Sequence, residues 1–466
     1  MIVNRDFCKM PLKTSSKKII GSIRDLSYTL PQMLIVASFL MFSSKMFCII
    51  CDDLVPGVKP ILLDRVGASA TDIALIIGTI PQILGFFLVP LISTVSDKTR
   101  TRFGRRIPYM MFSAPALLIL LQMIAWHREL SDLLIRCIPL LGNYNTDFYL
   151  LAGCILLFQV AFLFPGSVSS YLIVDVIPKE FIGRFMVCAM IIGTILRAGF
   201  NFFLLQTTVD HTKATFGVFG AIFALSYYLL FRYVKEGTYP PVEDKIEKSS
   251  SFFRKSYDYF TLFFRQCFSA RIYIYTFVCV GLNSASNICR NMFNVLFATK
   301  EIGMSVDQYG RIIGIGSLAA VIVVALLGKL MDKFNPMLIY LSSGLLIMLV
   351  NVFGHFFVYS PETFAVIGIA TAIMYAVQGV VLMPFLVAVF PADKFGQFAS
   401  ANSMSISVIL FFAAYLGGKL TDMLGYRVMF GWDFAVTLLA CLALLGVYSQ
   451  WKKYGGKNYV PPQKYS

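Results

Sequence analysis

Charged residues are scarce in this sequence of 466 residues. Asp, Glu, Lys and Arg together make up 14% of it, against about 25% in ordinary soluble domains. Hydrophobic residues make up 58%, and the mean hydropathy is +0.73. A water-soluble domain of this length cannot keep so much apolar surface away from solvent. The composition therefore excludes a soluble globular protein and indicates a lipid environment.

Histidine is scarcer still, with three residues at positions 127, 211 and 355 that stand far apart. No nucleophile–base pattern and no metal-ligand spacing accompanies them. Cys48 and Cys51 form a C-x-x-C pair on an apolar run, but no second pair exists, so we interpret both as packing residues. The sequence therefore predicts no catalytic residues, no metal site and no cofactor other than a coupling ion.

The sequence contains many long apolar runs. A membrane-spanning helix needs roughly 20 mostly apolar residues. Runs of that kind lie near 38–63, 71–94, 107–126, 148–174, 185–206, 215–234, 272–297, 309–331, 337–358, 363–390, 402–421 and 429–450. The strands of a membrane β-barrel would alternate in polarity, and these runs do not. We therefore predict an all-α integral membrane protein with twelve transmembrane helices.

The formal net charge is +15, and the distribution of the cations along the chain fits the predicted topology. Cations crowd the N-terminal tail, residues 97–106, residues 232–271 and the C-terminal tail. Twelve spans place all four regions on one side, and the positive-inside rule makes that side the cytoplasm. We expect both termini there, no nucleic-acid partner, and the first span as insertion signal, because no cleavable leader precedes it. The expected location is the cell membrane, most simply a bacterial inner membrane.

Internal repeats divide the chain into two halves. The charged stretch 235–271 separates six spans from six, which predicts bundles at 38–234 and 272–450 with cytoplasmic segments at 1–37 and 451–466. "PKEFIGRF" (178–185) after span four matches "PADKFGQF" (391–398) after span ten. "SDKTRTRFGRR" (96–106) after span two has a counterpart in "GKLMDKFNP" (328–336) after span eight. Two equivalent places in each half indicate duplicated six-helix bundles.

These loops resemble the signature of the major facilitator superfamily. Gly328–Lys333 has the form Gly-x-Leu-x-Asp-Lys, and Asp97–Arg106 the form Asp-Lys…Gly-Arg-Arg. The first copy departs from the pattern, since Ser93 replaces the leading Gly and residues 99–102 are inserted. That longer loop, with "DVIPKEFIGRF" (175–185), resembles the glycoside–pentoside–hexuronide:cation symporters and the sucrose-transporter-like branch. The resemblance implies the major facilitator fold, alternating access, and a central cavity lined by spans one, four, seven and ten.

The loops between spans also predict a gate. An acid at a helix end and arginines across a short turn can bridge two helices, and such contacts break and reform when two bundles rock. Topology alone would explain the cations but not the acid or the glycine turn. The predicted gating residues are Asp97, Gly104, Arg105, Arg106, Asp332, Lys333, Glu180 and Arg184.

The first span carries ionisable residues at bilayer depth, where they are costly and usually serve a function. Lys45, Asp52 and Lys59 are seven residues apart, and Asp53 is adjacent. Pro56 is expected to interrupt the helix just beyond them. In the alternative reading the helix ends at Cys51 and both acids are solvated. If they are buried, Asp52 and Asp53 are the predicted cation-coupling residues.

The coupling ion remains open at this point. A sodium site of the melibiose-permease type would need acids on the second span, which has only Asp72 and Asp97 at its ends. A proton on Asp52 or Asp53 is the favoured alternative, with Asp175 as the next candidate. If both acids stay paired with cations, the protein is a uniporter.

A polar stripe on the seventh span predicts the substrate site. Its residues follow the i, i+4, i+7/8 spacing of one helix face, and other spans add isolated polar residues. The predicted substrate-binding residues are Asn283, Asn287, Arg290, Asn291, Arg197, Asn201, Gln159, Tyr375 and Gln378. Helix–helix hydrogen bonding could explain two amides, but four amides and an arginine exceed that need.

Amides and aromatic rings suit a hydroxyl-rich solute. The sequence thus predicts a sugar or glycoside transporter, working as a monomeric symporter with a proton or another cation. The residue chemistry alone would also allow a hexuronide, a nucleoside or a small acid. A drug exporter, favoured by 43 Phe and 20 Met, and a membrane sensor are the alternative functions.

Overall fold

The computed structural model describes residues 19–23, 26–237, 263–331, 335–391 and 394–462. Within these ranges, twelve helices are long and apolar enough to cross a membrane, which confirms the predicted count. A short antiparallel hairpin of β1 (Ile19–Ile23) and β2 (Leu26–Thr29) precedes them. Several spans contain a π-helical turn, labelled η, between two α-helical segments.

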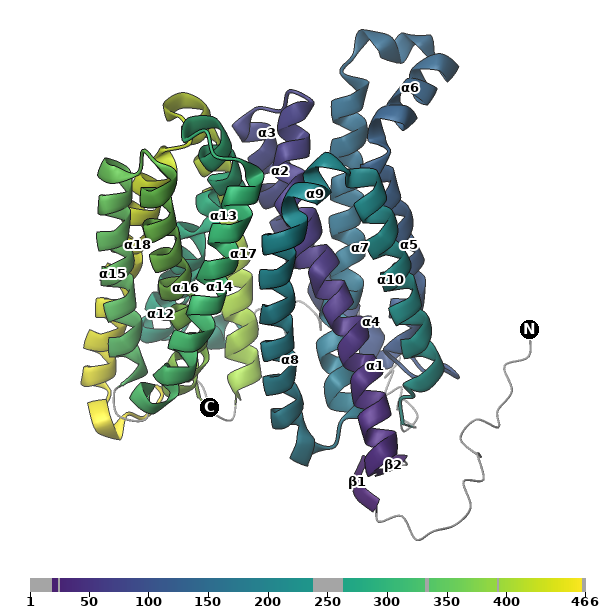
Figure 1. Cartoon of the computed structure of the whole chain (residues 1–466). Coiled ribbons are helices and arrows are strands. Elements are labelled where there is room, and N and C mark those ends of the chain that lie inside the picture. Colours follow the sequence, from purple (N-terminus) through teal and green to yellow (C-terminus); the bar gives the residue numbers. More distant parts are fainter. Residues whose placement is uncertain (1–18, 24–25, 238–262, 332–334, 392–393, 463–466) are drawn as a thin grey trace, which may run out of the picture.

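The first six spans occupy residues 30–233. They are α1 (Leu30–Cys48), η2 (Ile49–Leu54) and α2 (Val55–Arg65); α3 (Ala70–Ala74), η3 (Leu75–Thr79) and α4 (Ile80–Lys98); α5 (Ile107–Ala125); α7 (Thr146–Val176); α8 (Lys179–Gly199), η5 (Phe200–Leu204) and α9 (Leu205–Asp210); and α10 (Thr212–Tyr233). Between α5 and α7, α6 (His127–Cys137) and the 3-10 turn η4 (Pro139–Asn143) project beyond the bundle (Figure 1).

The last six spans occupy residues 271–453. They are α12 (Arg271–Ser286), α13 (Ile288–Leu296) and η6 (Phe297–Glu301); α14 (Val306–Met331); α15 (Pro336–Phe357); α16 (Pro361–Val389); α17 (Phe395–Leu424); and α18 (Val428–Lys453). A 3-10 turn, η8 (Gly456–Asn458), follows the last span. Pro178 stands before α8 and Pro391 before α17, so the repeated motif occupies equivalent places in the two halves.

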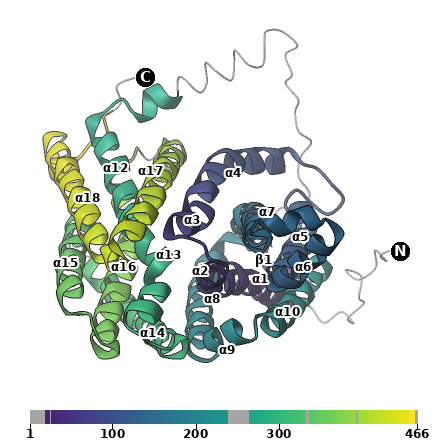
Figure 2. The ribbon, with the colours of Figure 1, turned by 90° about the horizontal axis from the view of Figure 1, so that it is seen from above.

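The two halves form separate groups of helices, purple to teal and green to yellow in Figures 1 and 2. In the first half α5 packs against α7 and α10, and α1 packs against α10. In the second half α12 packs against α17 and α18, and α15 against α16 and α18. The hairpin and the end of α18 lie at one end of the molecule, the β1 end; α3 and α6 lie at the other, the α3 end (Figure 1).

The halves meet where α17 packs on α3, η3 and α4, and where α14 packs on α8 and η5. Glycines allow this close approach. A Cβ atom on Gly78 would lie 2.6 Å from the Cβ of Ala414, and one on Gly314 would lie 2.3 Å from the ring of Phe202. Packing of small residues replaces the hydrophobic effect, which does not drive helix association in lipid.

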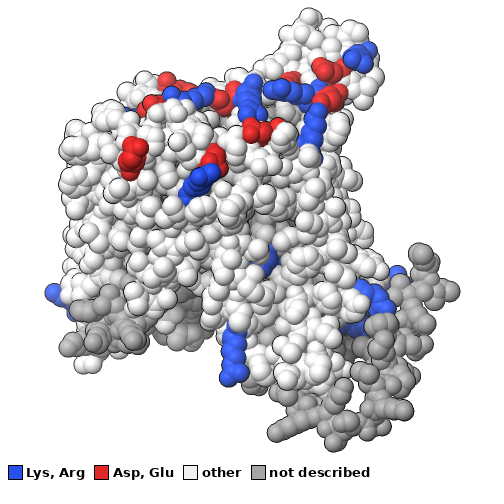
Figure 3. Space-filling model, viewed as in Figure 1, with Lys and Arg blue, Asp and Glu red and all other residues white. Residues whose placement is uncertain are grey.

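The outer surface of the molecule suits a bilayer. Phe112 and Phe203 are 83% and 78% exposed within their spans, as expected for side chains in contact with lipid. On the face in Figure 3, charged residues gather near the α3 end and the β1 end and leave the middle band almost uncharged.

The first span is longer than predicted, because it begins at Leu30 and continues to Arg65. The alternative in which the helix ends at Cys51 is therefore wrong. Pro56 stands near the start of α2, where its missing N–H is tolerated. The π turn η2 absorbs the disturbance just before it: the amide of Val55 bonds to the carbonyl of Ile50, five residues back.

Candidate functional site

A cavity of about 520 Å³ lies between the two halves. The first half lines it with α1, η2 and α8, and the second half with α14 and α16. Its volume falls in the range of small-molecule sites, roughly 300–1,000 Å³. The lining residues are Lys45, Cys48, Ile49, Asp52, Asp53, Met190, Gly193, Thr194, Leu196, Arg197, Ser317, Ala320, Val321, Val324, Ala372, Ala376, Gly379 and Val380.

All the charge of the cavity is on its first-half wall. Lys45, Asp52 and Asp53 come from the first span, and Arg197 comes from α8. Nε of Arg197 lies 2.7 Å from Oδ1 of Asp53. The Asp53 side chain is 9% exposed, whereas that of Arg197 is 49% exposed. Two cations and two carboxylates thus face one cavity, and a guanidinium partly committed to an ion pair remains accessible.

The π turn η2 places the acids on this wall. In a π turn the hydrogen bond spans five residues, so residues four and five apart share a face. Cys48 therefore lies in line with both Asp52 and Asp53, and all three line the cavity. Lys45 reaches across to α8, where a Cβ atom on Gly193 would lie 3.1 Å from its Nζ. Both acids therefore lie on the first of the twelve candidate spans, with Asp53 nearly buried and Asp52 exposed to the cavity, and their coupling role stays a prediction.

The opposite wall is apolar and built from small or branched aliphatic side chains. On α14 and α16 the only side chain with a polar group among the lining residues is Ser317. Among the residues that the structure describes, no aromatic side chain lines the cavity. The cavity is therefore amphipathic, with ions on one side and hydrocarbon on the other.

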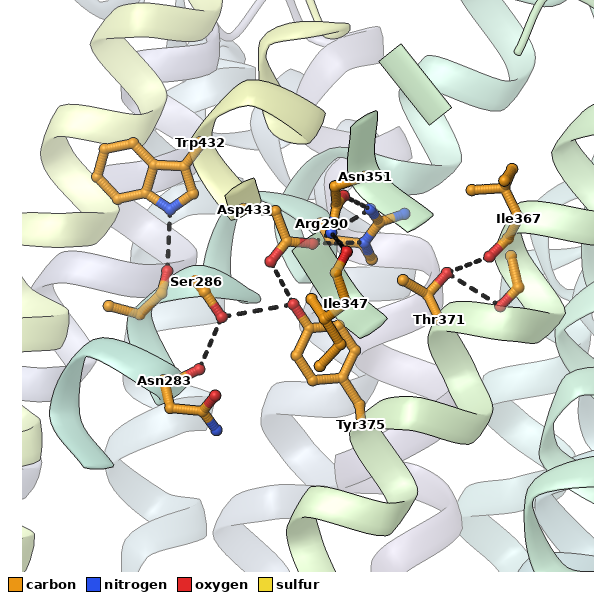
Figure 4. A network of polar contacts seen from close by, with 12 residues as sticks. Asn283, Ser286, Arg290, Ile347, Asn351, Ile367, Thr371, Tyr375, Trp432 and Asp433 are labelled. Carbon is orange, nitrogen blue, oxygen red and sulfur yellow. Dashed lines mark hydrogen bonds and ion pairs between the residues drawn. The ribbon is translucent and has the colours of Figure 1, made fainter. Parts of the chain in front are cut away.

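A second intramembrane charge pair is buried inside the C-terminal half (Figure 4). Nε and Nη2 of Arg290 on α13 lie 3.3 and 3.2 Å from Oδ2 of Asp433 on α18. Nη2 also donates to Oδ1 of Asn351 on α15 at 2.7 Å. The hydroxyl of Tyr375 on α16 donates to the other oxygen of Asp433 and lies 3.4 Å from Oγ of Ser286. Asp433 is fully buried, and the network joins four spans.

The structure places few of the predicted substrate-binding residues in the cavity. Arg197 lines it, as predicted, but the others are absent from its lining. Arg290 and Tyr375 belong to the buried network. Gln159 donates to the carbonyl of Ile76 at 2.9 Å and so joins α7 to η3. The Nδ2 group of Asn201 donates to the carbonyl of Arg197, one turn back on its own span.

The polar stripe of the seventh span is broken by the helix itself. The α-helix ends at Ser286 and restarts at Ile288, with Asn287 between them. Beyond that break Arg290 is buried and Asn291 is exposed. Asn287 and Gln378 each keep a buried amide oxygen without a hydrogen-bond partner among the described residues. A role for these amides and for Asn283 in substrate binding stays a prediction.

The loop before α5 forms a network of its own at the β1 end. Arg105 donates to both carboxylate oxygens of Asp175 on α7, at 2.8 to 3.1 Å. The carboxylate of Glu236 accepts the backbone N–H groups of Arg105, Arg106 and Ile107, at 2.7 to 2.9 Å. It thereby caps the positive N-terminus of α5.

Gly104 is required in this loop. Its φ is +110°, and a Cβ atom there would lie 2.5 Å from the Glu236 side chain. Arg184 is exposed on the first turns of α8. The remaining gating predictions cannot be placed: Asp332 and Lys333 lie outside the described residues, and so do the side chains of Asp97 and Glu180. The gating role stays a prediction.

Polar contacts also join the two halves at the α3 end. The carboxylate of Asp422 on α17 accepts the backbone N–H groups of Ala70 and Thr71, at 2.7 and 2.8 Å. The hydroxyl of Thr71 donates to the same carboxylate. Lys300 on η6 forms an ion pair with Asp64 on α2. These contacts hold the second half against the first at this end.

Sequence reasoning missed Asp433, Glu236 and Asp422. A signal existed for Asp433, because an acid inside the apolar run 429–450 is as unusual as the acids of the first span. Glu236 and Asp422 stand near predicted helix ends among other polar residues. Nothing in their local sequence distinguishes them from ordinary surface acids.

Comparison with known proteins agrees with this architecture. The family described as Major Facilitator Superfamily matches residues 276–463. No curated protein sequence matches the chain significantly. Among solved structures, the nucleoside transporter NupG superposes with a TM-score of 0.62 at 12% identity, covering 90% of this chain and 99% of NupG.

Two further structures are similar over a comparable length. A bacterial homologue of the iron transporter ferroportin, in an inward-facing state, has a TM-score of 0.64 at 14% identity, with 90% of this chain and 99% of that chain covered. The D-xylose-proton symporter has a TM-score of 0.58 at 14% identity, with 93% and 98% covered. At such identities these likenesses establish the fold and not the substrate. The chain therefore has the twelve-span fold of these solved transporters, and its residues 276–463 carry the sequence pattern of the Major Facilitator Superfamily.

Proposed function

We propose that this protein is a proton-driven symporter that carries a small organic solute bound in the cavity between its halves. The observation that carries the proposal is the charged wall of that cavity. Four ionisable side chains from α1, η2 and α8 face a space that both halves line. A site shared by two bundles is where alternating access requires the substrate to bind, because each bundle must sense its presence.

Asp52 is the residue that we assign to the proton. Asp53 is committed to Arg197 by a contact of 2.7 Å, whereas Asp52 is exposed in the same cavity. A carboxyl group in ordinary contact with a cavity can gain and lose a proton, while one held by a guanidinium keeps its charge. The resemblance to cation symporters supports the same role.

The contacts at the α3 end give the transport cycle its gate. Asp422 and the Asp64–Lys300 pair hold the halves together there. For the cavity to open at that end, these bonds must break, and the glycine contacts around Gly78 must separate. The network of Arg105, Asp175 and Glu236 orders the loop at the opposite end, where we place the second gate.

A carbohydrate substrate has less support than the sequence suggested. The amides and the aromatic ring that favoured a sugar lie outside the cavity lining. The apolar wall offers no hydrogen-bond partner to most of a sugar's hydroxyl groups, and it offers no aromatic ring for stacking. The same lack of aromatic surface argues against a multidrug exporter.

The test uses purified protein in liposomes that contain a trapped pH-sensitive dye. D-xylose, uridine, glucuronate and pentanesulfonate are added outside one at a time under an inward proton gradient. At least one solute is expected to accelerate proton entry in the natural sequence by tenfold or more, and Asp52→Asn is expected to abolish that acceleration. Asp307→Asn, which changes an exposed ion pair on α14, serves as the matched control. Solute entry without proton entry would instead establish a uniporter.

A further inference from the structure

The net charge of the cavity wall changes when a carboxyl group there gains a proton. Lys45 and Arg197 together balance Asp52 and Asp53, so the wall is neutral when all four are ionised. An arginine cannot lose its proton in a protein, and a lysine does so only at high pH. A carboxyl group can gain one. Protonation of a carboxylate therefore makes the wall positive.

Once Asp52 is protonated, hydrogen-bond donors outnumber the acceptors among the four ionisable side chains of this wall. A guanidinium has five N–H groups and an ammonium has three. The Nε group of Arg197 is directed at Asp53, and its side chain is 49% exposed. With a proton on Asp52, Asp53 is the one anionic side chain left among the described residues that line the cavity with Arg197 and Lys45. That arrangement recognises an anion.

The opposite wall selects the rest of the solute. Val321, Val324 and Val380 present branched aliphatic surface, and Ala320 and Ala376 keep the wall far enough back to leave room. Hydroxyl groups placed against this wall would lose their water without gaining a partner. An aliphatic group would gain the hydrophobic contribution of burial.

We propose that the cavity binds a small amphipathic monoanion, with its acidic group on Lys45 and Arg197 and its aliphatic body against α14 and α16. This assignment rests on the proposed transport function and names its substrate class. Binding of the anion and protonation of Asp52 favour each other. Protonation removes a negative charge that would repel the anion, and the anion neutralises the positive charge that would oppose protonation. A solute of one negative charge then crosses the membrane with one proton.

The experiment measures binding by calorimetry with the purified protein in lipid nanodiscs at pH 6. Pentanesulfonate is the probe, because a sulfonate stays ionised and cannot carry the proton itself. Pentyltrimethylammonium has a similar body with the opposite charge, and D-xylose represents a neutral polyol. We expect pentanesulfonate to bind at least tenfold more tightly than either. Equal binding of the three, or a preference for the cation or the sugar, would overturn the assignment.

Two series locate the site. From methanesulfonate to pentanesulfonate, affinity should rise about fourfold for each methylene, from roughly 0.8 kcal/mol per buried CH₂. Lys45→Gln should weaken pentanesulfonate binding at least tenfold. Val380→Thr should flatten the chain-length series, because a hydroxyl group replaces part of the aliphatic wall. Chain length without effect, together with full binding by Lys45→Gln, would place the anion elsewhere and refute the proposal.

Proton uptake separates this inference from the proposed function. Titrations in two buffers of different ionisation enthalpy count the protons bound with each anion. One proton for each anion in the natural sequence, and none in Asp52→Asn, is the expected result. Selective anion binding without proton uptake would uphold the substrate class and overturn the coupling. Proton-coupled entry of D-xylose in liposomes, without selective anion binding, would do the reverse.

Discussion

The protein contains two arginine–aspartate pairs inside its membrane-spanning helices, and their surroundings differ sharply. Asp433 is fully buried, and Arg290 is 9% exposed at its side chain. Asn351 and Tyr375 complete the hydrogen bonding of that pair, and the guanidinium lies 5.2 Å from the ring centre of Phe430. Arg197, in contrast, is half exposed in a cavity and contacts Asp53 through Nε. The same two residue types thus stabilise helix packing in one half and line a solute-sized cavity in the other.

The contrast follows from the cost of removing charge from water. A fully buried pair is tolerable only when its geometry is good and further hydrogen bonds satisfy its remaining donors and acceptors. Arg290 and Asp433 meet that condition by joining α13, α15, α16 and α18. A pair beside a cavity keeps part of its hydration, so it needs fewer partners. Its unused hydrogen-bonding capacity is then available to a solute.

The largest effect is expected at the buried pair. Asp433→Asn removes the charge opposite Arg290, and an uncompensated buried charge costs about 3–5 kcal/mol. We expect a lower thermal unfolding temperature and less monodisperse protein. The double variant Arg290→Met/Asp433→Leu should recover most of the lost stability, since hydrophobic replacement of a buried pair is often neutral. An Asp433→Asn variant as stable as the natural protein would show that the network does not stabilise the packing of these helices.

At the cavity pair the effect should fall on transport instead of stability. Asp53→Asn should lower the free energy of unfolding less than Asp433→Asn does, because the half-exposed guanidinium of Arg197 can regain water when it loses its partner. Solute-driven proton entry into liposomes should fall at least tenfold, because Arg197 loses the partner that positions it. Thermal unfolding and the dye assay, run on the same preparation, separate the two quantities. If Asp53→Asn lost as much stability as Asp433→Asn, both pairs would have the same structural role, and the proposed contrast between them would be wrong.

An intermediate effect is expected at Asp422, which joins the two halves at the α3 end. The quantity that should change is the population in which the halves are separated there. Asp422→Asn leaves one oxygen to accept from Ala70 or Thr71 and removes the negative charge. The loss of one charge-assisted hydrogen bond, about 1.5 kcal/mol, should raise the population separated at this end roughly tenfold.

Spin labels can measure this population at Leu133 and Met423, which are exposed on α6 and α17. The labelled chain needs the exposed Cys137 and Cys188 replaced first. A distance distribution between the labels that is unchanged by Asp422→Asn would mean that other contacts close this end.

The smallest effect is expected at a surface pair. Asp307 and Arg311 form an i, i+4 ion pair at 2.8 Å, with side chains 38% and 61% exposed. Exposed helical pairs contribute about 0.3–0.5 kcal/mol. Asp307→Asn should therefore leave the unfolding temperature and the transport rate close to those of the natural sequence. A clear loss of transport would reveal a role for this end of α14 that its exposure does not suggest.

Much of the architecture can be read from the sequence. The twelve spans follow from apolar runs that only lipid can accommodate, and the duplicated "PKEFIGRF" and "PADKFGQF" motifs show the two halves. The charged residues of the first span are visible for the same reason, because an ion in an apolar run is costly and needs a function. Asp52 and Asp53 were predicted at the site, and both line the cavity together with Lys45 of the same span.

The identity of the cavity wall was decided by the tertiary structure. Helical spacing shows which residues share a face, but not toward which neighbour that face turns. In lipid, apolar and polar faces are not sorted by contact with water, so only the packing of neighbouring helices sets the rotation of each helix. The break at Asn287 and the acid on α18 turned Arg290 inward, away from the predicted cavity. The π turn before Pro56 brought both acids of the first span to one face, opposite an arginine 144 residues away from Asp53.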